Sequence, residues 1–159
     1  MNYDIYIYTD GSAKGNPGPG GYGLVMEHPN TNYKKEFYEG FRLTTNNRME
    51  LLAVIVGLEK IKQPKTKVLV VSDSKYVIDS VVKKWVFGWE KKQFVGKKNS
   101  DLWKRFLKVY KTQEVSFQWV KGHNEHPQNE RCDALAVFAS TQTNLSIDAF
   151  YENEKSSLL

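Results

Sequence analysis

The chain has 159 residues, a net charge of +5 and a hydrophobic content of 40%, which suits a single domain with one core. No apolar run is long enough to span a membrane, and the first residues, MNYDIYIYTDG, alternate polar with apolar types, unlike a signal peptide. Cys132 is the single cysteine, so no internal disulfide can form. We therefore expect a cytoplasmic protein in which Cys132 is buried filler and not a nucleophile.

Three strands and a helix are predicted in the first part of the chain. Residues 3–8 alternate and are rich in β-favouring types, and residues 23–27 and 34–42 continue them as an antiparallel meander. The stretch 10–21 is rich in glycine and proline and is predicted to be a turn region. Residues 49–60 carry apolar side chains on one helical face, which indicates an amphipathic helix.

The second part of the chain alternates strands with helices. A nearly continuous apolar run at 68–72 is typical of a strand buried on both faces. Asp73-Ser74 then begins a helix, and Gly88 and Gly96 indicate loops in the segment that follows. The remaining predicted elements are a helix capped by Ser100-Asp101, a strand at 115–119, a polar loop at 122–130 and a helix at 131–141.

The predicted order βββαβα(α)βα defines one α/β domain with a five-stranded mixed sheet flanked by helices. We place this domain at residues 1–142. The chain is polar from there onward, so we expect residues 143–159 to form a partly disordered C-terminal extension that ends in a frayed tail at 152–159.

Four acidic residues lie where a predicted strand ends or a predicted helix begins, namely Asp10, Glu50, Asp73 and Asp133. An open α/β sheet gathers such positions at one edge. Four carboxylates that meet there repel one another unless a cation neutralises them. Their joint pattern therefore predicts a divalent-metal site.

Each acid also has a purely structural interpretation. Asp10 belongs to an Asp-Gly pair typical of turns, and Glu50 is spaced from Asn47 as in a capping box. Asp73 could cap its helix, and Asp133 could interact favourably with a helix dipole. Each interpretation suffices for one acid taken alone, and only the coincidence of all four favours the metal site.

A basic segment runs from Lys83 to Lys111 and contains nine lysines and one arginine against two acids, a net charge of +8. Such a mixture of cations and rings is typical of nucleic-acid surfaces. The alternative is a solvated helix face without a partner. The aromatic residues that interleave with the cations are Trp85, Phe87, Trp89, Phe94 and Trp103.

The glycine-rich stretch GSAKGNPGPGG lacks the Gly-Lys-Ser/Thr ending of a nucleotide-binding P-loop. We predict a hairpin turn whose glycines let a ligand approach the backbone. His123 lies in a polar loop ten residues before Asp133, where it can titrate near neutral pH or be an ordinary surface residue. His126, followed by Pro127, is predicted to be structural, and the histidines lack the cysteine partners of a zinc site.

Five segments share a family pattern in their order and spacing: YTDGSAKGNPGPGGYG, TTNNRMELLAV, VSDSKYVI, KNSDLWKR and WVKGHNEHPQNERCDALA. Together they resemble type 1 ribonuclease H, the bacterial-type ribonuclease HI, over roughly residues 3–141. The resemblance implies a ribonuclease H-like fold with three antiparallel strands, two parallel strands and a basic protrusion. It also implies a monomeric endonuclease that cuts the RNA strand of RNA–DNA hybrids without sequence specificity and leaves 5′-phosphate and 3′-hydroxyl ends.

The same resemblance assigns roles to individual residues. Asp10, Glu50, Asp73 and Asp133 match acids that hold two Mg²⁺ ions, for which Mn²⁺ is an alternative, and His123 matches a mobile catalytic histidine. The residues that match contacts to the hybrid are Asn16, Thr45, Asn46, Asn47, Lys75, Trp85, Trp89, Lys91, Lys92, Lys97, Lys98 and Asn99.

Lys75 departs from the family, which often has glutamine there, and we expect its minor-groove contact to become electrostatic. Two other functions stay open: a catalytically silent domain that binds hybrids, and a DNA nuclease of the integrase type. The complete set of acids argues against the first, and the asparagines and the basic segment argue against the second. Because the first strand follows Met1 closely, we expect a free-standing enzyme and not a part of a polymerase.

Overall fold

The computed structural model describes residues 2–122 and 126–157, and it contains one five-stranded mixed sheet in the order β3-β2-β1-β4-β5. The first three strands pair antiparallel, and β1, β4 and β5 pair parallel. The predicted topology is therefore confirmed. The strands are β1 (Ile5–Ala13), β2 (Gly18–Glu27), β3 (Lys34–Thr44), β4 (Lys67–Ser72) and β5 (Glu114–Trp119).

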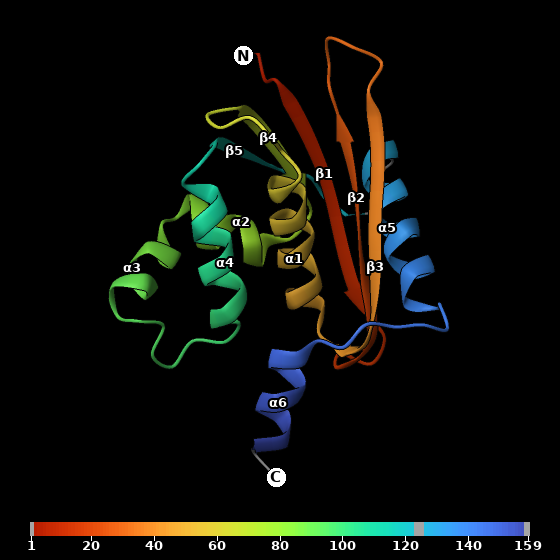
Figure 1. Cartoon of the computed structure of the whole chain (residues 1–159), viewed down its shortest axis with the longest axis vertical. Helices are drawn as coiled ribbons and strands as arrows, with labels where there is room; N and C mark the ends of the chain where they lie inside the picture. The colour runs from red at the N-terminus through yellow and green to blue at the C-terminus, as the bar shows by residue number, and fades with distance from the viewer. Residues whose placement is uncertain (1, 123–125, 158–159) are drawn as a thin grey trace.

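Helices cover both faces of the sheet (Figure 1). One face packs against α1, α2 and α4, and the other packs against α5. The alternation of β1 explains this arrangement, since Ile5 and Ile7 enter the larger core while Tyr8 faces α5. The helices are α1 (Asn46–Glu59), α2 (Lys75–Val82), α3 (Trp85–Lys91), α4 (Ser100–Tyr110), α5 (Pro127–Ser140) and α6 (Ala149–Ser157).

The glycine-rich stretch is more regular than predicted, because β1 continues to Ala13 and β2 begins at Gly18. Two of its glycines bring the sheet close to the protein's own helices. A Cβ atom at Gly11 would lie 2.7 Å from the carbonyl oxygen of Met49, and one at Gly21 would lie 2.7 Å from that of Ala136. Gly11 and Gly21 therefore fix the spacing between the strands and helices α1 and α5, and the approach of a ligand to the backbone of this stretch stays a prediction.

The helix starts differ from the prediction in three places. Thr45, and not Asn47, is the N-cap of α1, where its hydroxyl accepts from the Arg48 amide at 3.2 Å. Ser100 and Asp101, predicted to cap α4, are its first two residues, and Asn99 is its N-cap residue with a left-handed φ of 64°. Helix α5 starts earlier than expected, at Pro127, and His126 caps it by accepting from Asn129, which confirms a structural role for His126.

The basic segment contains a helix that the sequence did not predict. Gly88 was expected to mark a loop, but it lies inside α3, whereas Gly96, with a φ of 73°, is in a turn as expected. Figure 1 shows α3 at the outer edge of the molecule, beyond α2 and α4. This segment is the predicted protrusion.

The described C-terminal residues are attached to the domain instead of frayed. Residues 149–157 form α6, so the frayed tail expected from residue 152 is wrong for residues 152–157. Ser146 pairs with Phe41 of β3, and Arg42 forms a bidentate ion pair with Glu152 at 2.9 and 2.8 Å. These contacts hold α6 next to β3 and the start of α1 (Figure 1). The division of the chain at residue 142 stays a prediction.

Among the residues that the structure describes, no helix has both the length and the apolar composition needed to cross a membrane.

Candidate active site

The four predicted acids line one open pocket at the edge of the sheet. Asp10 lies in β1, Glu50 in α1, Asp73 directly after β4 and Asp133 in α5. One carboxylate oxygen from each of Asp10, Glu50 and Asp73 lies within 4.8 Å of the other two. Asp133 lies in the same pocket but outside this close group. The structure thus brings all four together, with three of them in contact range of a single ion.

The Gly11 amide fixes the two most buried carboxylates. It donates to Asp10 Oδ1 and to Glu50 Oε1, each at 2.9 Å. Asp10 is 6% exposed and Glu50 is 8% exposed, and Glu50 Oε2 accepts no hydrogen bond within the described part of the chain. A buried carboxylate oxygen without a donor is unfavourable in an empty protein and well suited to a cation.

Burial and crowding hold protons on these groups. Burial is the main cause that raises the pKa of Asp10 to about 7, and the charges of Asp73 and Asp133 add to it. Burial, followed by the charge of Asp10, raises the pKa of Glu50 well above its usual range. A bound cation removes the repulsion that causes part of these shifts. The donor set, which consists of hard carboxylate oxygens, fits a divalent metal ion.

Two further residues hold Asp73 in place, and the sequence did not single them out for this role. The Trp119 indole donates to the Asp73 carbonyl oxygen at 3.0 Å. A Cβ atom at Gly122 would lie 2.7 Å from Asp73 Oδ2, so a side chain there would displace the carboxylate from its present position. Lys75 lines the same pocket, and its ammonium lies 4.7 Å from the centre of the Trp119 ring. His123, the predicted catalytic histidine, lies outside the described residues.

The predicted polar contacts of the substrate gather at the start of α1. The Oδ1 atom of Asn16 accepts from the Asn46 amide at 2.9 Å, and Asn46 Oδ1 accepts from the Ala13 amide at 2.6 Å. Because both oxygens are used, the two side-chain NH₂ groups are the free ends of these residues in the described structure. Asn47 is exposed, and it lines the acid pocket together with Asn46.

The aromatic residues of the basic segment divide into two groups. Trp103 is fully buried and Phe94 is 6% exposed, so these two belong to the core and not to a nucleic-acid surface, which corrects the prediction. Trp85 is 47% exposed, and the partly exposed Trp89 has the Lys97 ammonium 5.2 Å from its ring centre. An open, basic and aromatic pocket is lined by Lys84, Trp85, Gly88, Trp89, Lys92 and Lys97.

The other predicted contacts of this segment also lie at its surface. Lys91 and Lys98 are exposed, and Asn99 is partly exposed. The Asn99 side chain donates to the Tyr76 hydroxyl at 3.0 Å, and Tyr76 itself lines the acid pocket. Asn99 therefore lies between the basic segment and the acids.

A mixed sheet with a carboxylate pocket at its edge and a basic arm beside the pocket defines a metal-dependent nuclease. The family model described as RNase H matches residues 2–141. Ribonuclease H of Desulforamulus reducens is 51% identical over 150 residues, which cover 91% of this chain and 92% of that protein. The chain therefore belongs to the RNase H family.

Solved structures of the same family agree with this assignment. The crystal structure of LC9-RNase H1, a type 1 RNase H with the type 2 active-site motif, matches with a TM-score of 0.76 and 29% identity and covers 96% of this chain and 81% of that one. The structure of LC11-RNase H1 in complex with an RNA/DNA hybrid matches with a TM-score of 0.63 and 27% identity and covers 85% of this chain and 95% of that one.

Proposed function

We propose that this ribonuclease H cuts the RNA strand of RNA–DNA hybrids in the pocket of Asp10, Glu50, Asp73 and Asp133, with two Mg²⁺ ions. The observation that carries the proposal is the close group of three carboxylates, in which one buried Glu50 oxygen has no donor among the described residues. When bound, Mg²⁺ supplies an activated water and stabilises the leaving 3′-oxygen, which gives 5′-phosphate and 3′-hydroxyl ends. Mn²⁺ is an alternative metal for the same oxygen ligands.

The residues of the pocket then have distinct roles. Asp10, which lies close to both Glu50 and Asp73, is proposed to hold both ions, and Asp133 is proposed to complete one of the two sites. The Gly11 amide keeps the Asp10 and Glu50 carboxylates aligned. We assign His123, from the sequence pattern alone, to proton transfer or product departure.

Selection of a hybrid is proposed to depend on the amide groups beside the pocket. The free NH₂ groups of Asn16 and Asn46, with Thr45 and Asn47 next to them, suit the 2′-hydroxyls that line the wide minor groove of an A-like helix. The exposed cations and tryptophans of the basic segment suit the backbone of the DNA strand, which carries no base information. Cleavage is therefore expected to be independent of sequence.

The experiment that tests the function uses a hybrid whose RNA strand is end-labelled, incubated with Mg²⁺ or with EDTA. The same sequence as duplex DNA and as duplex RNA provides the controls. We expect metal-dependent cleavage of the RNA in the hybrid alone. Binding without cleavage would instead indicate a silent hybrid-binding domain, and cleavage of duplex DNA would indicate an integrase-type nuclease.

The basic segment is tested by neutralising four of its exposed lysines. We expect weaker hybrid binding and a flatter dependence of affinity on salt, since each lost phosphate contact lowers the slope by about 0.7–0.9. The matched control neutralises four exposed lysines at the other end of the sheet and should leave the slope unchanged. An equal slope in both proteins would mean that the segment is only a solvated face. The tested residues are Lys91, Lys92, Lys97 and Lys98, and the control residues are Lys34, Lys35, Lys62 and Lys65.

We also propose that the enzyme acts as a monomer in the cytoplasm. The single, fully buried cysteine is compatible with a reducing compartment. Light scattering coupled to size exclusion should give the mass of one chain, 18.4 kDa.

A further inference from the structure

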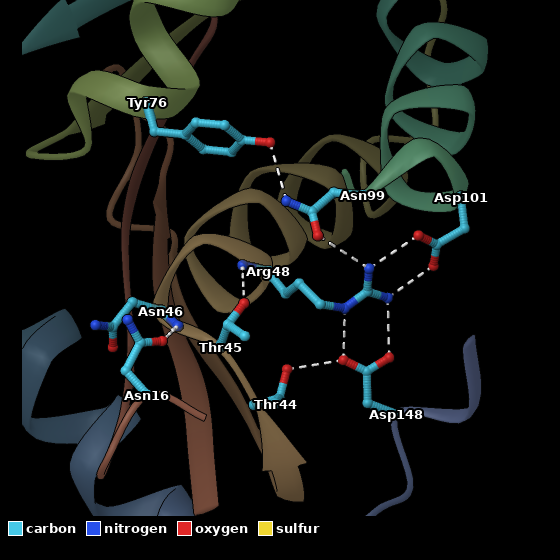
Figure 2. A network of polar contacts seen from close by, with 9 residues as sticks. All are labelled: Asn16, Thr44, Thr45, Asn46, Arg48, Tyr76, Asn99, Asp101 and Asp148. Carbon is cyan, nitrogen blue, oxygen red and sulfur yellow. Dashed lines mark hydrogen bonds and ion pairs between the residues drawn. The ribbon is translucent and has the colours of Figure 1, made fainter. Parts of the chain in front are cut away.

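Arg48 is a buried cation in the first turn of α1, between the proposed substrate contacts and the acid Glu50. Its side chain is 3% exposed, so its charge needs partners inside the protein. All five N–H donors of its guanidinium are used: two bonds go to Asp148, two to Asp101 and one to Asn99, over 2.7–3.3 Å (Figure 2).

The bonds of Arg48 join three segments that are far apart in the sequence. Asp101 belongs to the first turn of α4, and Asp148 immediately precedes α6. Asp148 is 8% exposed and also accepts from the Thr44 hydroxyl at 2.7 Å. Burial acts to lower the pKa of Arg48, but the hydrogen bonds to the two aspartates outweigh it and raise this pKa above its ordinary value. The guanidinium therefore stays charged, and its hydrogen bonds connect α1 to α4 and to the residue that precedes α6.

Asn99 and Asp101 are partly exposed members of this cluster, and Asn99 is the one that connects it to Tyr76 of the acid pocket. Its Oδ1 accepts from Arg48 Nη1 at 3.3 Å, and its Nδ2 donates to the Tyr76 hydroxyl at 3.0 Å (Figure 2). Arg48 offers only donors, so it requires the oxygen of the Asn99 amide on its side. The NH₂ group is thereby directed away from Arg48, and its second hydrogen is available at the partly exposed face between the basic segment and the acid pocket.

We propose that Arg48 and Asp148 form a positioning pair through which the C-terminal segment, residues 146–157, orients the Asn99 amide toward a backbone phosphate of the nucleic acid. The inference deepens the proposed function and rests on it. A phosphate oxygen is an acceptor and requires the NH₂ side of Asn99, which is the side that the pair leaves outward. The Ser146 pairing with Phe41 places Asp148 beside Arg48, whereas the exposed Arg42–Glu152 ion pair lies in α6 and does not contact Arg48.

The test compares steady-state cleavage of a hybrid by the full-length wild type, Asp148→Asn, Asn99→Ala and the double variant, each below its own melting transition. Asp148→Asn keeps the size of the side chain but removes its charge from the guanidinium. We expect each single variant to raise KM about 10-fold with kcat nearly unchanged, as for a lost charge-assisted hydrogen bond in binding. The double variant should lose no more than either single one, because both changes remove the same contact.

The matched control is Arg42→Gln/Glu152→Gln, which breaks the exposed ion pair of α6 without touching Arg48. It should leave KM at the wild-type value. If the role of Asp148 is only to stabilise the fold, Asp148→Asn will lower the melting temperature but share the KM of this control, and the proposal is overturned. Additive losses in the double variant would overturn it as well.

A milder variant covers the case in which Asp148→Asn does not fold. Thr44→Val removes the hydroxyl that donates to Asp148 Oδ2 and preserves the shape of the side chain. Thr44→Val should also raise KM. When it is combined with Asn99→Ala, KM should rise no further than in Asn99→Ala alone. An unchanged KM in Thr44→Val contradicts the proposal. Absence of cleavage by the wild type itself would instead be a failure of the proposed function, so the two failures are distinguishable.

Discussion

Two charged residues of α1, Arg48 and Glu50, are nearly equally buried, at 2% and 8% exposure, yet their surroundings are opposite. Every donor of Arg48 has an acceptor, and two aspartates surround its charge. Glu50 has other carboxylates as neighbours, and no described residue donates a hydrogen bond to one of its oxygens. The two side chains are only two residues apart in the sequence, so the difference arises from what the rest of the fold brings to each of them.

The comparison separates a structural charge from a functional one. A buried charge costs several kcal/mol unless partners satisfy it. The protein supplies those partners to Arg48 and thereby fixes α1, α4 and the C-terminal segment in one arrangement. It withholds them from the acid pocket, where the uncompensated negative charge can be relieved by a divalent cation. Affinity for metal and the instability of the metal-free pocket have the same origin.

The largest effect is expected for Asp10→Asn, which removes the carboxylate that both metal sites are proposed to share. We expect cleavage of the hybrid to fall on the order of 10³-fold or more. In EDTA at neutral pH, the same variant should be more stable than the wild type, because one of the crowded buried charges is gone. Steady-state cleavage with Mg²⁺ and thermal unfolding in EDTA measure the two effects.

Hybrid binding in EDTA is the control for Asp10→Asn and should change little, since the amides and the basic segment remain. Substantial activity of the variant would contradict the assignment of Asp10 to the metal. A loss of stability in EDTA would contradict the view that the pocket is strained without its cation.

The comparison is tested directly by neutralising each of the two residues of α1 in turn. Arg48→Met leaves Asp148 buried without its charge partner and should lower the free energy of unfolding by about 3–5 kcal/mol. Glu50→Gln removes a carboxyl group that the metal-free fold must either bury as a charge or protonate at neutral pH, and it should raise the free energy of unfolding by about 1 kcal/mol or more in EDTA. Urea unfolding of both variants gives the two values, and effects of the same sign would refute the distinction.

The sequence predicts the sheet well because its signals are local. Alternation in β1 and the unbroken apolar run of β4 follow directly from which faces are buried. The acids could also be predicted, since strand ends and helix starts meet at one edge of such a sheet. Asp133 lies outside the close group of the other three acids. Its distance from them depends on how α5 packs, which cannot be predicted from the spacing of the acids in the sequence.

The sequence fails where burial depends on distant partners. Asp148 is in a polar stretch, and Arg48 follows four polar residues, so each looks like a surface residue until the fold brings them within 2.7 Å. Helix α3 was missed because it has only seven residues and Gly88 at its centre. Trp119 and Gly122 carry no local signal for their contact with Asp73. Tertiary contacts decide all these cases.

The metal-free protein should lose stability as the pH rises from about 4 to about 7. Asp10 titrates near pH 7 in the folded protein but near pH 3.9 when unfolded. Over this window the folded state binds more protons, so the free energy of unfolding falls by up to about 1.4 kcal/mol per pH unit for each extra proton. Asp10→Asn should reduce the slope in EDTA, and Mg²⁺ should restore stability at neutral pH. A slope that is equal in both proteins would assign the effect to other groups.

The smallest effect is expected for Lys75→Gln, which asks whether the pocket has a compensating cation of its own. Lys75 is the one cation among the described residues that line the acid pocket, but it is exposed and lies over the Trp119 ring. Asp101 and Asp148 neutralise the charge of Arg48, and we expect that Lys75 does not neutralise the acids in this way. Its loss should then change the free energy of unfolding in EDTA by no more than about 0.5 kcal/mol. The salt slope of hybrid binding should fall by about 1 or less, which corresponds to one phosphate contact.

Lys35→Gln, which removes a cation over the Phe37 ring outside this pocket, is the matched control. A loss of stability well above that of the control would show that Lys75 neutralises the carboxylates, and the pocket would then be less dependent on its metal than Glu50 indicates.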